Sequence, residues 1–211
     1  VTLELAIYSI FFATFIGIFF GSIAALKKNT WLDYLPMTIS MAGICIPSIV
    51  LGPLLSLIFG IWLGWLPVSG WGEGYPGSKI LPVITLGTAY AAYCARLSRG
   101  GMLEVLGQDF IRTARAKGLS ERYIDVRHVL RNAIIPVVTI LSFSLAGMLT
   151  TGFITERLLG IPGVGDFAIQ AIFNRDYPVI MAFTLILSTA FVVANLLADI
   201  AYSLIDPRIR L

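Results

Sequence analysis

Residues 96–131 read RLSRGGMLEVLGQDFIRTARAKGLSERYIDVRHVLR and form the most highly charged segment of the chain. It carries eight of the chain's 15 Lys and Arg residues and lies between long hydrophobic runs. A charged side chain at the centre of a bilayer costs about 2.5–3.5 kcal/mol on insertion scales. The segment must therefore protrude from a membrane, and its excess of basic residues places it on the cytoplasmic side.

The uncharged runs on either side indicate the class of protein. Residues 5–26, 132–155 and 177–198 span 22, 24 and 22 positions, each long enough to cross a hydrocarbon core of about 30 Å. Residues 80–95 form a shorter run of 16. With 57% hydrophobic and only 13% charged residues, the chain is predicted to be an all-α, polytopic helical membrane protein.

A further uncharged run, residues 34–72, is too long for one simple span. We expect Pro47 and Pro53 to kink or break the helix that begins near Trp31. The chain then forms a single transmembrane domain over residues 1–211. Its five expected helices cover about residues 2–26, 31–61, 79–99, 132–154 and 178–205, with outer loops at residues 62–78 and 155–176. In the second outer loop we expect a turn at Pro162–Gly163 and a short helix from Val164 to Phe173.

The distribution of cations orients these helices. Lys79, Arg157 and Arg175 fall in the expected outer parts, and the other 12 of the 15 Lys and Arg residues fall on the cytoplasmic side. Because cytoplasmic loops carry such an excess of Lys and Arg, the net charge of +3 reflects membrane orientation and does not indicate nucleic-acid binding. The chain's start then lies outside, so we expect a sixth helix before Val1 in the intact chain.

The basic segment itself contains a helical pattern. Gly118 is suited to end a helix, and Ser120 to cap a second one. Two interpretations agree with this pattern: an amphipathic helix that lies on the lipid headgroups, or a protruding helical segment that binds a soluble partner. The apolar residues that recur at steps of three and four, and so predict one helix face, are Leu103, Leu106, Phe110 and Ala114.

The string DFIRTARAKGLSERYIDVRHVLRNAIIPVV, at residues 109–138, resembles the cytoplasmic coupling segment of ABC-importer permeases of the dipeptide, oligopeptide and nickel type. The general signature of these permeases begins Glu-Ala-Ala and has a Gly four positions after the second Ala. Here Arg112, Thr113 and Ala114 stand at the first three positions and Gly118 at the glycine, a variant typical of the peptide branch. The strings LPVSG, PGVG and RDYP in the outer loops are also similar to this family. We refer to residues 100–131 as the coupling segment.

The resemblance implies a type I importer permease fold and ATP-driven, binding-protein-dependent import of dipeptides or oligopeptides. Import of nickel or another small solute is the alternative. The resemblance also implies that the chain is not an enzyme and holds no cofactor, since ATP and Mg would be bound by a partner ATPase. The other implied partners are a second permease subunit, an extracytoplasmic substrate-binding protein and membrane lipid, with no nucleic acid, in the cytoplasmic membrane of a prokaryote.

Three groups of candidate site residues follow from the resemblance and from the chemistry of their side chains. The ATPase-coupling group is Asp109, Phe110, Arg112, Thr113, Ala114, Arg115, Lys117 and Gly118. We expect Phe110 and Ala114 to be buried in an ATPase groove, with Arg112, Arg115 and Lys117 around its rim. Candidates for the translocation pathway are Thr88, Ser144, Thr150 and Thr151. Candidates for contact with the binding protein are Glu156, Asp166, Arg175 and Asp176.

Two rival classes of protein fit the sequence less well. A secondary transporter or channel needs ion-binding groups inside the membrane, and only Asp199 suggests one. We interpret Asp199 as a structural ion-pair partner of Arg96 or Arg99. A membrane enzyme needs a catalytic constellation at one interface, which the sequence does not show.

Overall fold

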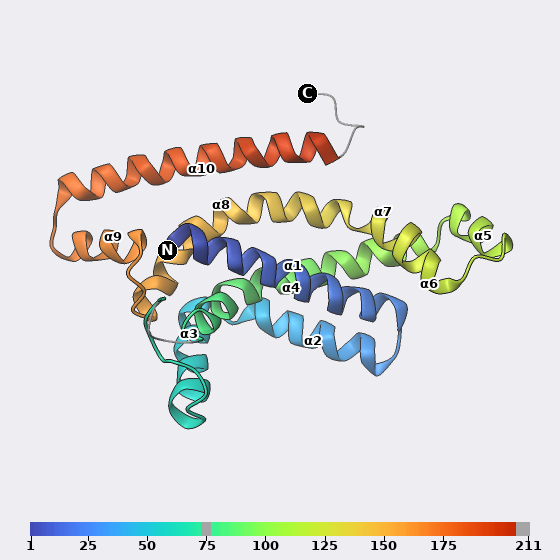
Figure 1. The fold of residues 1–211 in the computed structure, drawn as a ribbon, viewed down its shortest axis with the longest axis horizontal. Helices are drawn as coiled ribbons and strands as arrows, with labels where there is room; N and C mark the ends of the chain where they lie inside the picture. The colour runs from blue at the N-terminus through green and yellow to red at the C-terminus, as the bar shows by residue number, and fades with distance from the viewer. Residues whose placement is uncertain (73–76, 206–211) are drawn as a thin grey trace.

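A computed structural model describes residues 1–72 and 77–205 and shows helices joined by loops in this part of the chain (Figure 1). Among the described residues, four helices are long and apolar enough to cross a membrane. The all-α fold predicted from the hydrophobic runs is confirmed. The four are α1 (Thr2–Leu26), α4 (Ile80–Leu106), α8 (Ile135–Leu158) and α10 (Tyr177–Ile205).

Small residues allow α1 to pack closely along α4 (Figure 1). A Cβ added at Gly17 would lie 2.4 Å from the Cβ of Cys94, and one added at Gly21 would lie 2.4 Å from the carbonyl oxygen of Ala95. Both glycines are therefore needed for this contact, which is how small residues bring membrane helices together.

A bent pair of helices lies between α1 and α4. Helix α2 (Trp31–Cys45) and α3 (Ser48–Leu55), which continues as a π-helical segment η1 (Ser56–Trp62), meet at an angle of 109°. The break falls at Ile46 and Pro47, as expected, and if the pair is one span the described chain has up to five. Pro53 does not break the helix, since α3 continues through that residue, and a kink at Pro53 stays a prediction.

The coupling segment is built differently from the single helix predicted over Leu103–Ala114. Helix α4 continues past Arg99 to Leu106, and the chain then turns at Gly107 and Gln108, where Gln108 is extended. The return to the membrane reaches α8 three residues later than expected. Between α4 and α8 lie α5 (Asp109–Ala116), α6 (Glu121–Tyr123), the π-helical η2 (Ile124–Leu130) and α7 (Arg131–Ala133).

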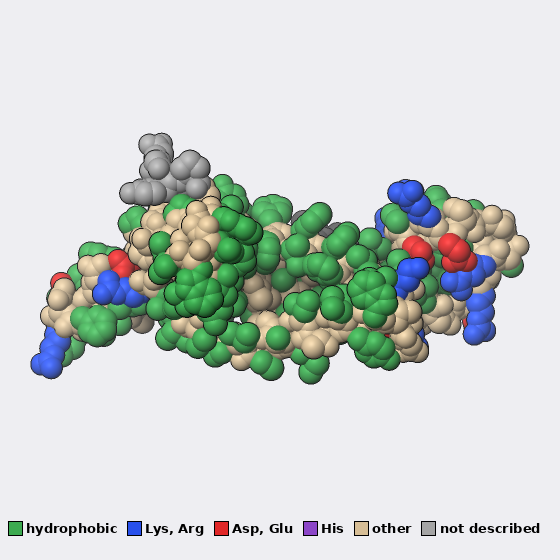
Figure 2. All heavy atoms as spheres, turned by 90° about the horizontal axis from the view of Figure 1, so that it is seen from below, with side chains coloured by type: hydrophobic (Ala, Val, Ile, Leu, Met, Phe, Trp, Pro, Cys, Tyr) green, Lys and Arg blue, Asp and Glu red, His purple; other side chains and the backbone are tan. Residues whose placement is uncertain are grey.

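The two ends of the molecule differ in charge. The N-terminus, α3 and α9 (Val164–Phe173, at its predicted position) lie at one end, and α5 and α6 lie at the other (Figure 1). Figure 2 shows Lys and Arg side chains at both ends, most densely at the α5 end, and hydrophobic side chains over the middle. On the middle, Phe15 is 72% exposed and Leu185 is 70% exposed, as expected of surfaces that face lipid or another membrane subunit.

Candidate functional site

The coupling segment has its own hydrophobic core. Ile111 and Ile124 are fully buried in it, and burial of each such side chain contributes roughly 1.5–3 kcal/mol. Helix α5 is therefore packed onto both arms of the segment as one body. The buried cluster consists of Ala25 from α1, Met102 from α4, Ile111 and Ala114 from α5, Ile124 and Val129 from η2, and Ala133 from α7.

The structure separates the two residues expected to enter an ATPase groove. Ala114 is only 7% exposed and lies inside the cluster, so the expectation that it fills a partner's groove is wrong. Phe110 is 45% exposed and remains available to a partner. The turn at Gly107 and Gln108 shifts the helical phase, so that Ile111 faces inward and Phe110 faces outward.

The charged residues of α5 are exposed but not equivalent. Arg115 donates two hydrogen bonds to Glu121, Nε to Oε1 at 2.9 Å and Nη2 to Oε2 at 3.2 Å, and these bonds raise the pKa of Arg115 above its ordinary value. Arg115 therefore braces α5 against α6. Arg112 lies 3.4 Å from Asp109 one turn earlier on the same helix, an exposed pair worth little, and Lys117 is also exposed.

Gly118 ends α5 in the left-handed conformation that the sequence predicts. Its φ is +76°, its N–H donates to the carbonyl of Arg115 at 2.9 Å, and the N–H of Leu119 reaches the carbonyl of Ala114 at 3.4 Å. This pair of bonds is a Schellman motif, which favours glycine at this position. Thr113, on the preceding turn, is exposed, and its hydroxyl donates to the carbonyl of Asp109.

An ion pair fixes the point where α4 leaves the membrane. Arg99 donates from Nε to Oδ1 of Asp33 at 2.6 Å and from Nη2 to Oδ2 at 2.8 Å, and the N–H of Asn29 donates to Oδ2 at 3.0 Å. The Asp33 side chain is 2% exposed. Arg99 thus pairs with Asp33 of α2. The side chain of Asp199, the partner expected from the sequence, lies outside the described residues.

The four pathway candidates bond their hydroxyl groups locally, and two of them line different cavities in the described part of the chain. Each hydroxyl donates to a carbonyl of its own helix: Thr88 to Ile84, Ser144 to Ile140, and Thr150 and Thr151 to Gly147. Thr88 lines a cavity between α1, α2 and α4. Thr151 lines a different cavity, of about 270 Å³, beside the break between α2 and α3. A shared pathway through all four residues stays a prediction.

At the outer end, Glu156 is fully buried, so the expectation that it contacts a binding protein directly is wrong. Its Oε2 accepts hydrogen bonds from the N–H groups of Gly165 at 2.8 Å and Asp166 at 3.3 Å, in the first turn of α9. A Cβ added at Gly163 would lie 2.2 Å from that oxygen. Glu156 therefore anchors the N-terminus of α9, where a negative charge is favoured.

The other outer candidates lie nearer the surface. Asp166 is bonded to Arg157 at 3.0 Å and to Gln170 at 2.7 Å. Asp176 accepts from the N–H of Val179 at 3.3 Å and so caps α10. Arg175 is exposed, with a φ of +55°, and of the four candidates its side chain is the one best placed for a partner.

Sequence reasoning missed a charged cluster at the outer end of α1 and α4. Glu4 accepts hydrogen bonds from Lys79 and from Nε1 of Trp71, the latter at 3.3 Å. The Lys79 ammonium also lies 5.2 Å from the ring centre of Trp71 and 5.3 Å from that of Tyr8. The sequence did contain a signal for this cluster, because Glu4 and Lys79 carry opposite charges at the outer ends of two neighbouring spans.

Comparison with known proteins identifies the family. Residues 17–211 match the family described as "Binding-protein-dependent transport system inner membrane component". The chain is 43% identical over 210 residues to the oligopeptide transport system permease protein OppB of Haemophilus influenzae, with 100% of this chain and 69% of that protein covered. It is also 43% identical over 211 residues to the dipeptide transport system permease protein DppB of Bacillus subtilis, with 100% and 68% covered.

A solved structure supports the fold. The inward-facing MetNI methionine ABC transporter has a chain with a TM-score of 0.81 to this one, at 18% identity, with 97% of this chain and 93% of that chain covered. The fold of a type I importer permease, expected from the resemblance, is therefore confirmed. The chain belongs to the family of binding-protein-dependent transport permeases and is a membrane-spanning permease of an ABC importer.

Proposed function

We propose that this permease translocates dipeptides or oligopeptides across the cytoplasmic membrane of a prokaryote. The observation that carries the proposal is the identity of 41–43% that extends over the whole chain to permeases named for oligopeptide and dipeptide transport. A permease named for transport of glutathione, itself a short peptide, is 43% identical over 212 residues. Nickel or another small solute is the alternative substrate, and no specific contact favours it.

The energy for transport would come from a partner ATPase that binds ATP and Mg. Helix α5 would dock on that ATPase through Phe110, Arg112, Thr113 and Lys117, all of which are exposed. The internal cluster joins α5 to α1, α4, η2 and α7, and α7 leads directly into α8. A displacement of α5 would therefore move the inner ends of α4 and α8 together, as rigid-body switching requires.

The remaining partners would complete the transporter. A second permease subunit would supply the other wall of the pathway, since Thr88 and Thr151 line different cavities in this chain. A substrate-binding protein would contact the outer end beside α9, where Arg175 is exposed. The chain itself would carry no catalytic residue.

The test is uptake into proteoliposomes that hold the intact transporter, with ATP inside and the binding protein outside. We expect uptake of a labelled tripeptide that requires ATP and is competed by unlabelled oligopeptides. Uptake of labelled nickel, unaffected by peptides, would instead support the alternative substrate. Peptide uptake driven by an ion gradient without ATP would contradict the ABC mechanism.

A further inference from the structure

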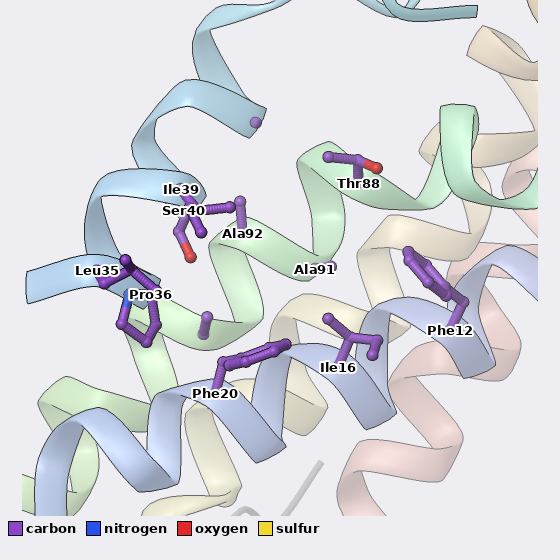
Figure 3. Close-up of a pocket in the computed structure, with 12 residues that line it drawn as sticks. Phe12, Ile16, Phe20, Leu35, Pro36, Ile39, Ser40, Thr88, Ala91 and Ala92 are labelled. Atoms are coloured by element: carbon purple, nitrogen blue, oxygen red, sulfur yellow. The ribbon is translucent and has the colours of Figure 1, made fainter. Parts of the chain in front are cut away.

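An apolar groove with a cavity of about 220 Å³ lies between α1, α2 and α4. Figure 3 shows Phe12, Ile16 and Phe20 along α1, facing Ile39 of α2 and Ala92 of α4. Among the residues that line the cavity, only Ser40 and Thr88 carry hydroxyl groups, and the Thr88 hydroxyl is bonded within its own helix. The groove is therefore suited to a hydrocarbon chain.

Two lysines stand at the cytoplasmic end of this groove. Lys27 and Lys28 are exposed in the turn that joins α1 to α2. Lys27 is seven residues beyond Phe20, or about 10 Å along a helix. The acidic residue nearest to them in the chain is Asp33, whose side chain is 2% exposed and paired with the Arg99 guanidinium, so Asp33 does not cancel the positive charge of the two lysines.

Aromatic side chains mark the same level of the membrane. Trp31 and Tyr34, in the first turn of α2, are 69% and 62% exposed. Tryptophan and tyrosine with this exposure are typical of the interface between hydrocarbon and headgroups. The groove, the aromatic pair and the lysine pair therefore follow the order of acyl chain, interface and headgroup along the membrane normal.

We propose that this groove binds an anionic phospholipid of the inner leaflet. One acyl chain lies in the cavity between Phe12, Phe20 and Ile39, and the phosphate lies between Lys27 and Lys28. A protein helix is about 10–12 Å across with its side chains and would only cover the mouth of the groove. A single acyl chain is slim enough to enter it, and an anionic headgroup complements the lysine pair.

The test measures lipid retained by the intact transporter. The complex is reconstituted with phosphatidylcholine and phosphatidylglycerol and then extracted in mild detergent. Native mass spectrometry identifies the lipids that remain bound from the mass of the complex. We expect the parent to retain phosphatidylglycerol in preference to phosphatidylcholine. The double variant Lys27→Gln, Lys28→Gln should lose that preference by on the order of fivefold for each lysine removed, and Arg175→Gln, at the outer end, should retain it.

A second variant fills the groove. Ser40→Phe places a ring in the cavity and should abolish retention, whereas Ala42→Phe adds the same ring to the same helix outside the lining and should not. Equal retention of phosphatidylglycerol by the parent and Ser40→Phe would overturn the proposal. A photo-crosslinker at Ile39 should attach to lipid; attachment to another subunit, or to a part of this protein outside residues 1–211, would overturn it as well.

Discussion

Replacing Phe110 by Ala separates docking from internal packing. The side chain is 45% exposed in this chain, and full burial of a Phe contributes roughly 1.5–3 kcal/mol. Docking that covers the exposed fraction is therefore worth about 0.7–1.4 kcal/mol, which corresponds to roughly three- to tenfold in Kd. We expect Phe110→Ala to weaken binding of the permease to its ATPase by that factor, measured by titration of the purified ATPase onto the permease in nanodiscs.

Two variants make this measurement decisive. Phe173→Ala removes a 75% exposed ring from the opposite end of the molecule and should leave ATPase affinity at the parent value. Ile111→Ala opens a cavity in the buried cluster and should destabilise the segment by about 2–5 kcal/mol, seen as faster hydrogen exchange throughout α5. If Phe110→Ala binds the ATPase as tightly as the parent does, Phe110 does not dock on that subunit.

Three further changes test separate contacts. Gly118→Ala should lower the stability of the end of α5 by about 1–2 kcal/mol, because alanine must adopt the left-handed φ there, although an added Cβ would meet no atom. Hydrogen exchange at the end of α5 should become faster, and unchanged exchange would argue against the Schellman motif. Asp33→Asn should lower the stability of the complex against thermal unfolding by about 3 kcal/mol, because it leaves the Arg99 charge without its partner. The double variant Asp33→Asn, Arg99→Gln should recover part of that loss, and strictly additive losses would mean that the two side chains do not interact. Glu156→Ala should lower the stability against thermal unfolding by about 1–3 kcal/mol, because it leaves the buried N–H of Gly165 without an acceptor, and Glu156→Gln should lower it less. Equal losses would show that the volume of the side chain matters there and its hydrogen bond does not.

Much of the helical layout could be predicted from the sequence. The bounds of α1 and α9 were predicted, because a charged pair follows α1 and a Pro-Gly turn precedes α9. The break at Pro47 was predicted because proline lacks an N–H and disfavours a helical residue before it. These signals are local, and nothing in the tertiary structure opposes them.

Features that depend on tertiary contacts could not be predicted. The spacing from Leu103 to Ala114 is continuous, yet the chain turns at Gly107 so that α5 packs across both arms of the segment. Burial of Glu156 depends on two backbone N–H groups that only the folded loop brings to it, although glycines nearby were a signal. The choice of Asp33 as the partner of Arg99 likewise depends on how α2 packs beside α4.

Docking of α5 on the ATPase can be tested by a contact measurement at Thr113, an exposed residue of that helix. A photo-reactive amino acid replaces Thr113 in the intact transporter, and a matched one replaces Ile172 of α9, which is 56% exposed at the opposite end. We expect the Thr113 probe to form an adduct with the ATPase and the Ile172 probe to form none. An adduct from Ile172 to the ATPase, or none from Thr113, would contradict that docking.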